Sequence, residues 1–328
     1  MLAWRVHELG EPAEVLRLEE VPDPVPRAGQ VLIEVEAAAL NFPDVLLCRG
    51  GYQRRPRLPF TPGGEVAGRV VAVGDDVRLP VGERVLALPG AGFAERVIAP
   101  ELAVFPLGDL ALDWPEAAAL PVAYQTAFAA LHVRGGLREG ETVLVHAAAG
   151  GVGSAAVQLA VAAGARVIAT AGGKHKTDAC LANGAAVAID YHGSDIVESV
   201  RDATDGAGVD LIVDPVGGVV LETSLKCLAF EGRVVLVGFA SGDIPEIPAN
   251  RVLLKNISIV GLHWGLYATE RPALLQEVHR QIVRLAAEDR IRPVLYGEFG
   301  WGELPALLQQ LGDGKTWGKV IVRPDGHQ

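Results

Sequence analysis

The chain has 328 residues, half of them hydrophobic, and it carries 40 Asp and Glu against 29 Lys and Arg, which gives a formal net charge of −11. This length and composition are typical of a globular protein with two domains, and the space between two domains is the default position of a ligand site. The acidic balance, which no basic stripe interrupts, excludes nucleic acid as the main partner, and the lack of a long uncharged apolar run excludes a membrane partner.

The first 121 residues are predicted to form a mostly β domain. Short apolar runs separated by Gly and Pro occupy 31–39, 66–73, 84–88 and 94–99. Runs of this length between turn residues favour the strands of a compact sheet. Residues 1–8 hold no basic region followed by an apolar run, so we expect no secretory leader and a cytoplasmic protein.

Between residues 122 and 263 the pattern changes to strict alternation of strand and helix. The predicted strands are apolar on both faces, as in parallel sheets that helices cover. They occupy 142–147, 166–170, 187–190, 211–214, 233–238 and 257–261. The sequence therefore predicts an α/β fold with a doubly wound parallel sheet of the Rossmann type.

The residues after 264 are predicted to return to the first domain. A helix-like segment extends to 284–288, and it is followed by an apolar run at 294–299, a helix at 304–311 and a strand at 319–322. We expect this final strand to join the first sheet. The predicted domains are therefore 1–121 with 264–328, and 122–263 inserted between them.

The segment 252–261 is predicted to be one long strand at the edge of the inserted sheet. A free edge strand exposes unpaired backbone groups and invites pairing with another chain. We therefore expect a two-fold homodimer that forms through this edge.

The three cysteines, Cys48, Cys180 and Cys227, are far apart and form no CxxC pair. Neither a disulfide framework nor a thiolate metal site is predicted from them. Free cysteines commonly behave as small apolar side chains, so we expect all three to be buried.

A glycine-rich segment follows the first strand of the inserted domain. Gly150, Gly151, Val152 and Gly153 lie between the apolar run 142–147 and an apolar-periodic helical stretch. This order is typical of dinucleotide-binding domains, because the glycine turn brings the pyrophosphate against the free amides of the helix N-terminus. The four residues are predicted to bind the phosphates of a dinucleotide.

The end of the second strand of this domain favours NADPH over NADH. NAD-binding domains place an acidic residue there for the ribose hydroxyls, whereas this chain has Gly172, Gly173, Lys174, His175 and Lys176. Two lysines and two open glycine amides would attract a 2′-phosphate. In the alternative interpretation, the lysines form the solvated start of a helix.

A strand-rich domain followed by a dinucleotide domain resembles the medium-chain dehydrogenase/reductase superfamily, in which many alcohol dehydrogenases bind zinc. A catalytic zinc needs three Cys, His or acidic ligands. Where those enzymes carry Cys and His, the segments 40–44 and 62–68 hold non-ligands, with Gly64 in place of a His. We expect no metal, and we interpret His146 and His263 as structural.

Longer motifs narrow the resemblance and cover nearly the whole chain. The chain resembles the zinc-free quinone oxidoreductase and zeta-crystallin branch in the segments 41–44, 49–52, 58–68, 92–95, 147–153, 190–191, 214–217 and 318–320. This resemblance implies a Rossmann domain inserted in a GroES-like catalytic domain. It also implies hydride transfer from NADPH to a quinone or a related conjugated carbonyl compound. The chain departs from the branch at Leu46 and Cys48.

The resemblance further implies roles for individual residues. Asn41 and Thr126 would lie by the nicotinamide, and Asp44 and Tyr52 would line the substrate site. The remaining cofactor residues implied in this way are Gly173, Lys176 and Tyr191 at the 2′-phosphate, Val216, Gly238 and Phe239 on the adenine and nicotinamide side, and Lys319 close to the cofactor.

Several of these residues also suit a purely structural role. Asn41 and Asp44 could be loop or helix caps. The other residues have structural alternatives too. Tyr52 could be an aromatic residue at the rim of the site, and Thr126 an ordinary hydroxyl residue of a helix. Tyr191 could be an aromatic residue of an edge strand, and Lys319 a solvated residue at the end of a strand.

The implied mechanism asks little of the side chains, because a quinone is already electron-poor and positioning supplies most of the help. Asn41 or a neighbouring amide would polarise the acceptor oxygen, and Asp44 or water would relay a proton.

Two other functions remain open. One is an NADPH-dependent reductase of α,β-unsaturated acyl thioesters or ketones. For this function, the arginine cluster of Arg49, Arg54, Arg55 and Arg57 would form a basic entrance to the substrate site, and in the alternative interpretation the cluster is a solvated loop. The other function, of a different class, is that of a cofactor-binding protein with a structural or regulatory role.

Overall fold

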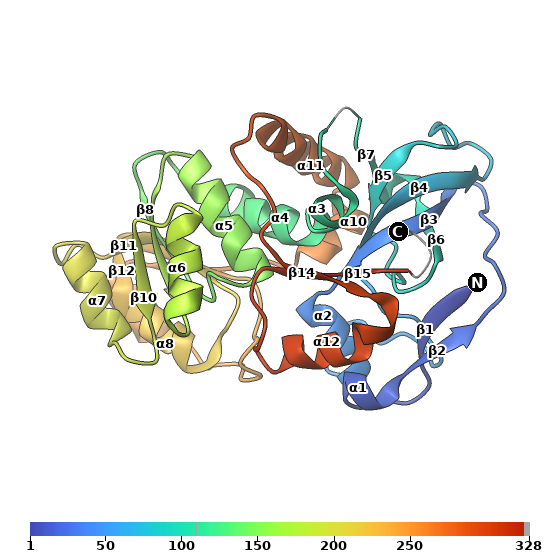
Figure 1. Ribbon diagram of the computed structural model, residues 1–328. Coiled ribbons are helices and arrows are strands. Elements are labelled where there is room, and N and C mark those ends of the chain that lie inside the picture. Colours follow the sequence, from blue (N-terminus) through green and yellow to red (C-terminus); the bar gives the residue numbers. More distant parts are fainter. Residues whose placement is uncertain (109, 325–328) are drawn as a thin grey trace. The chain divides into compact units, whose positions relative to one another are not determined.

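The computed structural model describes residues 1–108 and 110–324 (Figure 1). The chain forms two compact units. Unit 1 comprises Met1–Val122, His279–Ala287 and Arg292–Gln328, and unit 2 comprises Ala123–Val278 and Glu288–Ile291. The return to unit 1 at His279 comes later than residue 264, where the sequence analysis placed it. The long helix α11 (Pro272–Ala287) begins in unit 2 and ends in unit 1.

Unit 1 is built on a seven-stranded sheet around the long strand β3 (Gln30–Ala39). β3 pairs antiparallel with β4 (Glu65–Val73), β6 (Arg96–Pro100) and the C-terminal β15 (Lys319–Arg323). The prediction that the final strand joins the first sheet is confirmed, since Ile321 lies opposite Ala39. The other strands of unit 1 are β5 (Arg84–Ala87), β7 (Val104–Pro106) and β14 (Leu295–Gly300), with β1 (Leu2–Val6) and β2 (Leu16–Glu20) in a separate antiparallel pair.

The core of unit 1 follows from the period-two pattern of its strands. Val31, Ile33 and Val35 alternate along β3 and are fully buried, and they belong to one cluster with Phe93 and Trp301. Burial of a side chain of this size contributes about 1.5–3 kcal/mol. The packed sheet thereby fixes the position of the helix that directly follows β3.

Helix α2 (Phe42–Arg49) starts directly after β3. Asn41 is its N-cap in extended conformation, and Pro43 lies in the first turn, where its missing N–H has no cost. Gly50 ends the helix with a left-handed φ of 72°. The other helical segments of unit 1 are α1 (Pro12–Val15), α3 (Trp114–Ala118), α12 (Leu304–Gly312) and the 3₁₀ turns η1 (Glu101–Ala103) and η4 (Trp301–Glu303).

Unit 2 contains a six-stranded sheet in the order β10-β9-β8-β11-β12-β13, and all neighbouring strands in it are parallel. The first strand of the unit lies inside the sheet, as in a Rossmann domain, so the predicted fold class is confirmed. The strands are β8 (Thr142–Val145), β9 (Arg166–Ala171), β10 (Val187–Asp190), β11 (Val209–Asp214), β12 (Leu228–Leu236) and β13 (Ser258–Gly261).

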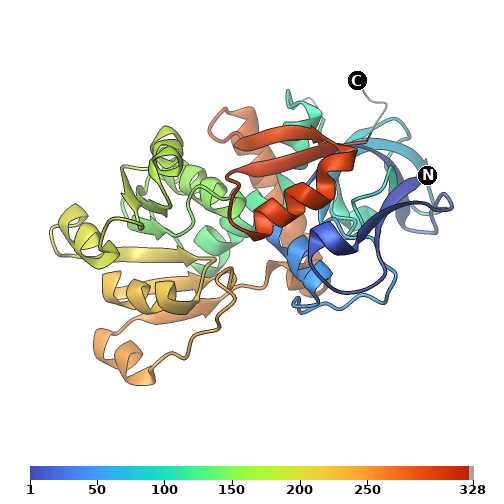
Figure 2. The same ribbon diagram turned by 60° about the horizontal axis from the view of Figure 1, so that its bottom comes forward.

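Helices cover both faces of the unit 2 sheet (Figures 1 and 2). Val200 of α7 and Leu221 of α8 pack with Ile168 and Ile212 of the sheet in one buried cluster. The helices are α4 (Pro121–Phe128), the π-helix η2 (Ala129–Arg134), α5 (Gly151–Ala162), α6 (Lys174–Ala182), α7 (Ile196–Ala203), α8 (Gly218–Cys227), α9 (Ala249–Lys255), η3 (Trp264–Leu266) and α10 (Tyr267–Glu270), besides α11.

The prediction of one long strand at 252–261 is wrong. Its first half belongs to α9, which Asn256 ends in the left-handed conformation, and the strand β13 starts only at Ser258. Leu253 and Leu254 are exposed on this helix, so the apolar run that suggested a strand is not a buried one. β13 is nevertheless the edge strand of the sheet.

Cys48, Cys180 and Cys227 are free and buried, as predicted. Burial raises the pKa of the Cys48 thiol to about 12. Its reactive thiolate form is therefore disfavoured at neutral pH. In the part of the chain that the structure describes, no helix has both the length and the apolar composition needed to cross a membrane.

Candidate active site and nucleotide site

Three buried polar side chains of unit 1 form one hydrogen-bonded cluster. Asn41 Nδ2 donates to Glu65 Oε1 over 2.8 Å and, more weakly, to the Ala39 carbonyl over 3.3 Å. Asn41 Oδ1 accepts from the Lys319 ammonium over 2.7 Å. Both ends of the amide therefore have protein partners, and the bond at 3.3 Å is the weakest of them.

Lys319 is not a solvated strand end. Its side chain is 4% exposed, and its ammonium donates to Glu65 Oε1 at 2.6 Å, to Asn41 Oδ1 and to the Leu40 carbonyl at 2.9 Å. Glu65 also accepts from the backbone N–H of Val122 over 2.6 Å. All three N–H bonds of the ammonium are used inside unit 1, so this lysine fixes the orientation of the Asn41 amide.

Asp44 has the cap role that the sequence analysis gave as an alternative. Its two carboxyl oxygens accept from the backbone N–H of Asn41 over 2.9 Å and from that of Gly63 over 3.0 Å. Burial raises the pKa of Asp44 to about 7, although these two N–H groups and the Lys319 charge lower it. Asp44 thus joins α2 to the loop that contains Gly63 and Gly64.

The loop at 62–64 requires glycine at one position. Gly63 has a φ of 113°, and a β-carbon there would lie 2.5 Å from the backbone nitrogen of Phe93. A β-carbon on Gly64, the position of a zinc-ligating His in the alcohol dehydrogenases, would lie 3.6 Å from Asn41 Nδ2. The described residues contain no group of three His, Cys, Asp or Glu side chains that could hold a metal ion.

Tyr52 is half-buried, and burial together with the Asp44 charge raises its pKa. The arginine cluster that follows Cys48 in the sequence is not a single feature. Arg49 makes a bidentate ion pair with Glu11, with a closest distance of 2.7 Å. The others, Arg54, Arg55 and Arg57, are exposed.

In unit 2 the glycine-rich segment forms a tight turn from β8 into α5. A β-carbon on Gly153 would lie 2.2 Å from the Ala147 carbonyl, and Ala147 itself has a φ of 47°. Among the residues described, the backbone N–H groups of Gly151, Val152 and Gly153 have no protein acceptor, and Gly150 is the N-cap of α5. These amides fit a pyrophosphate, since a helix N-terminus favours negative charge.

The residues predicted to hold the 2′-phosphate follow the neighbouring strands β9 and β10. Gly172 and Gly173 lead into α6, Lys176 is half-buried on its first turn with a pKa that burial lowers, and Tyr191 is exposed at the end of β10. Lys174 pairs instead with Asp178 over 2.8 Å, which agrees with the alternative of a solvated helix start.

The prediction of two open glycine amides is wrong for one of them. The Gly173 N–H donates to Asp190 Oδ1 over 2.9 Å, and the backbone N–H of His192 donates to the same oxygen over 3.0 Å. These bonds hold the pKa of Asp190 below its usual range. The sequence analysis gave this carboxylate no role at the glycines, because it ends β10 and not β9.

The segment Asp214–Gly217 is closed into a turn by its own carboxylate. Asp214 Oδ1 accepts from the backbone N–H of Val216 over 2.8 Å and from that of Gly217 over 3.0 Å. The segment with Gly238 and Phe239 folds onto this turn, since a β-carbon on Gly217 would lie 2.5 Å from the Phe239 ring. The structure thus brings Val216, Gly238 and Phe239 together, and their place beside the cofactor stays a prediction.

Thr126 lies half-buried on α4, and in the described structure it makes no hydrogen bond with another predicted site residue. His146 is buried at the end of β8 between Thr170 Oγ1 at 2.9 Å and Ser224 Oγ at 2.8 Å, and burial lowers its pKa. Both ring nitrogens have partners, which fits the interpretation of His146 as structural. His263 is exposed.

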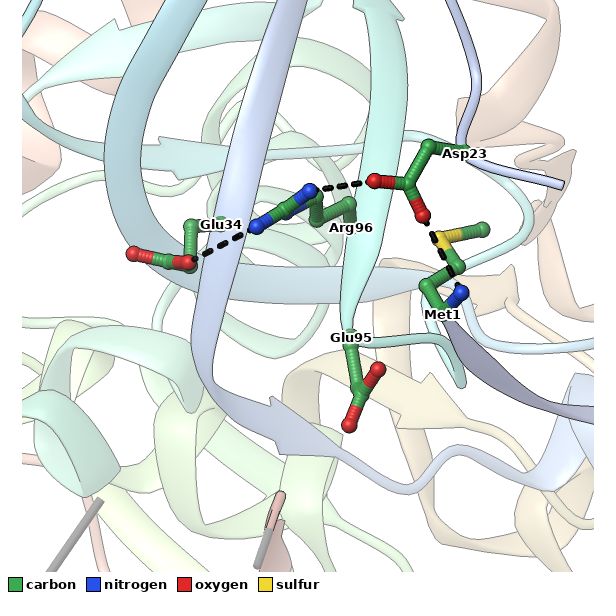
Figure 3. Close-up of a pocket in the computed structure, with 5 residues that line it drawn as sticks. All are labelled: Met1, Asp23, Glu34, Glu95 and Arg96. Carbon is green, nitrogen blue, oxygen red and sulfur yellow. Dashed lines mark hydrogen bonds and ion pairs between the residues drawn. The ribbon is translucent and has the colours of Figure 1, made fainter. Parts of the chain in front are cut away.

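A separate cavity of about 330 Å³ lies in unit 1 and is lined by charged groups (Figure 3). Asp23 binds both the Met1 amino group, at 3.0 Å, and Arg96, and Arg96 also faces Glu34 at 3.7 Å. Glu95 accepts from the Leu2 N–H. The charges satisfy one another, so this cavity is not part of the candidate site.

Comparisons with known proteins place these features in a family. Residues 27–109 match the family model described as alcohol dehydrogenase GroES-like domain, and residues 151–280 match the one described as zinc-binding dehydrogenase. A quinone oxidoreductase-like protein 2 homologue of Nematostella vectensis is 40% identical over 299 residues, which are 90% of this chain and 81% of that protein. The chain belongs to the quinone oxidoreductase family of medium-chain dehydrogenases/reductases.

Two solved structures illustrate the range of this family. The quinone oxidoreductase from Thermus thermophilus, solved also in complex with NADPH, is 37% identical, with a TM-score of 0.85 and coverage of 98% of this chain and all of that one. The enoyl reductase CurK is 28% identical, with a TM-score of 0.89 and coverage of 98% and 99%. Unit 2 is accordingly the NADP-binding domain of the family.

Proposed function

We propose that the chain is an NADPH-dependent oxidoreductase that transfers hydride to quinones or closely related conjugated carbonyl compounds without zinc. The observation that carries the proposal is its similarity, over nearly the whole length, to quinone oxidoreductases, one of which was solved with NADPH. The buried cluster of unit 1 supports the absence of zinc, because Glu65 is its only side chain of a zinc-ligating type and is already paired with the Lys319 ammonium.

For the cofactor we propose the residues that the nucleotide unit offers. The free amides of Gly151, Val152 and Gly153 would hold the pyrophosphate, and Lys176 with Tyr191 would hold the 2′-phosphate. Val216, Gly238 and Phe239 would line the adenine and nicotinamide side, and Thr126 would lie by the nicotinamide. When bound, NADPH supplies the hydride.

For the acceptor we propose that Asn41 polarises the oxygen that gains negative charge. Its bond to the Ala39 carbonyl is long, at 3.3 Å, so an acceptor oxygen can replace that carbonyl at Nδ2 at small cost. Lys319 and Glu65 hold the other atoms of the amide, so the donor is already oriented before substrate arrives. A preoriented donor is the arrangement that stabilises a developing oxyanion most effectively.

For Asp44 and Lys319 we propose positioning roles. Asp44 is 1% exposed and both its oxygens accept backbone N–H groups, so the proton that completes reduction comes from water. Lys319 acts on the substrate and cofactor only through Asn41, because its three N–H bonds are used. Tyr52, which is half-buried, is the proposed aromatic contact of the acceptor ring.

The proposed assembly is a homodimer that forms through β13. Its support is the position of Ser258–Gly261 at the edge of the parallel sheet, where unpaired backbone groups can continue the ladder in a second copy. The test is the mass in solution by light scattering at micromolar concentration. A monomer would contradict the proposal.

The function is tested by the rate of NADPH oxidation with benzoquinone and naphthoquinone. The proposal expects saturable acceleration of at least about tenfold over the uncatalysed rate, with NADPH preferred over NADH. The variant Asn41→Ala is expected to lower kcat. Bound NADPH without acceleration by any quinone would contradict the proposal and would favour a structural or regulatory role.

One observation favours a second candidate, reduction of α,β-unsaturated thioesters, namely the similarity to the enoyl reductase CurK. Against this candidate, Arg49, one of the four arginines expected to give a basic entrance for the thioester, is already paired with Glu11. Crotonyl-CoA assayed beside the quinones separates the two functions. Turnover of crotonyl-CoA at a higher kcat/KM than any quinone would favour the enoyl reductase.

A further inference from the structure

The loop after α2 carries three exposed arginines, Arg54, Arg55 and Arg57. In the described part of the chain none of them forms an ion pair. The segments 51–64 and 85–94 contain no Asp or Glu, although the chain as a whole has a net charge of −11. Unpaired positive charge is therefore concentrated in one loop of an acidic protein, and such a concentration attracts anionic ligands.

Short contacts connect Arg54 to the surroundings of the Asn41 amide. A β-carbon built on Gly90 would lie 3.1 Å from Arg54 Nη1. Two residues further on, a backbone N–H of the same loop donates to the Gly63 carbonyl over 2.8 Å. The next residue, Gly64, borders the proposed donor, because a β-carbon on it would lie 3.6 Å from Asn41 Nδ2. The Arg54 guanidinium thus lies over a loop that is bonded to the loop beside Asn41.

Tyr52, the proposed aromatic contact of the acceptor ring, lies within reach of the same guanidinium. Burial and the Asp44 charge raise the pKa of Tyr52, whereas the Arg54 charge lowers it. Charges act over about 10 Å in dilute salt. An acceptor ring on Tyr52 therefore places its substituents within the range of the Arg54 charge.

We propose that Arg54, with Arg55 and Arg57, selects conjugated carbonyl acceptors that carry an anionic substituent such as a carboxylate or a sulfonate. The inference rests on the proposed function, in which Asn41 and Tyr52 hold the acceptor. A guanidinium offers a planar pair of donors that matches an anionic group with two oxygens. Because these arginines have no carboxylate partner, binding of the substituent breaks no ion pair of the protein.

The salt dependence of the reaction follows from the exposure of the three arginines. Exposed charges of one sign raise the rate at which an anionic molecule meets the site, and dissolved ions screen this attraction. The preference for an anionic acceptor is therefore expected to be strong at low ionic strength and weak at high ionic strength. A neutral acceptor has no net charge for the arginines to attract.

The experiment measures kcat/KM for NADPH-dependent reduction of a naphthoquinone sulfonate and of the parent naphthoquinone, and it compares their ratio among variants. Differences in reactivity between the two quinones cancel in this comparison. The triple variant Arg54→Gln, Arg55→Gln, Arg57→Gln is expected to lower the ratio by about fivefold to tenfold at low salt. Raising the ionic strength from about 20 mM to about 300 mM is expected to bring the wild-type ratio down toward that of the variant.

A second triple variant, Arg17→Gln, Arg27→Gln, Arg78→Gln, is the matched control. It removes the same number of exposed charges from unit 1 and is expected to keep the wild-type ratio. An equal fall of the ratio in both triple variants would overturn the inference, because net charge alone would then explain it.

The wild type alone also tests the inference. Turnover of both quinones with a ratio that salt does not change would overturn the selection by the arginines and leave the proposed function standing. Turnover of neither quinone would overturn the proposed function and this inference together.

Discussion

The Lys319 ammonium lies 2.6 Å from Glu65 Oε1, and the two side chains are 4% and 0% exposed. The pair joins the last strand of unit 1 to β4, and Asn41 bridges it from the N-terminus of α2. A charge pair removed from water stabilises a fold only when its remaining hydrogen bonds are satisfied. Here Leu40 and Val122 supply them from the backbone.

Lys319→Met is expected to lower the free energy of unfolding by about 3–5 kcal/mol, because it leaves the Glu65 carboxylate buried without a counter-charge. Urea denaturation measures the change. The matched control is Lys315→Met, which removes an exposed ion pair with Asp313 and is expected to have a much smaller effect, because solvent screens exposed pairs. Equal stability losses in the two variants would contradict the account of the cluster.

Asp44 makes the stability of the fold depend on pH. Its folded pKa of about 7 lies above the usual value for a carboxyl group, so the folded state binds the proton more tightly and stability falls as the pH rises from about 4 to 7. Asp44→Asn removes this dependence. Relative to the wild type, the variant is expected to be more stable at pH 8 than at pH 5 by on the order of a few kcal/mol.

The comparison at two pH values isolates the ionisation of Asp44. The amide of the variant has the same hydrogen-bonding groups at pH 5 and pH 8, so any change between the two pH values comes from the wild-type carboxyl group. A stability difference between wild type and variant that is the same at pH 5 and pH 8 would show that Asp44 keeps an ordinary carboxyl pKa.

His279 contributes a pH dependence of the opposite sign. It stacks on Phe105 with the ring centroids 4.1 Å apart, and burial lowers its pKa to about 4. The unfolded chain then binds the proton more tightly, so stability is lost as the pH falls from about 6.5 through 4. His279→Phe is expected to remove this part of the acid sensitivity in denaturation curves. Unchanged acid sensitivity would contradict the prediction.

Gly153→Ala is expected to abolish NADPH binding, because its β-carbon would lie 2.2 Å from the Ala147 carbonyl and would displace the turn that carries the phosphate-binding amides. Gly302→Ala is the control, since its β-carbon would meet nothing within 4 Å. Fluorescence titration with NADPH measures both. Binding by the Gly153 variant within about twofold of the wild type would contradict the proposed cradle.

Much of the fold could be predicted from the sequence because its signals are local. The glycine turn at 150–153 and the apolar strands of unit 2 follow from periodicity and composition, and the structure confirms the parallel sheet. The strand predicted at 252–261 failed because Leu253 and Leu254 are apolar but exposed on a helix. Hydrophobicity alone does not separate these two cases in a short run.

The site was less predictable because its partners are distant in the sequence. Nothing near Lys319 signals that its ammonium binds Glu65 and Asn41, and a lysine at a strand end usually is solvated. Asp190 was missed for the same reason, since its contact with Gly173 exists only after β10 pairs with β9. Burial and long-range hydrogen bonds are properties of the fold and not of a motif.

The central claim is hydride transfer from NADPH to a quinone. The most direct measurement is single-turnover oxidation of NADPH by benzoquinone in stopped flow, with NADPH carrying deuterium on one or the other face of its nicotinamide. The account predicts enzyme-accelerated oxidation that slows for one of the two deuterated forms and not for the other. Oxidation at the uncatalysed rate, with no difference between the two forms, would contradict it.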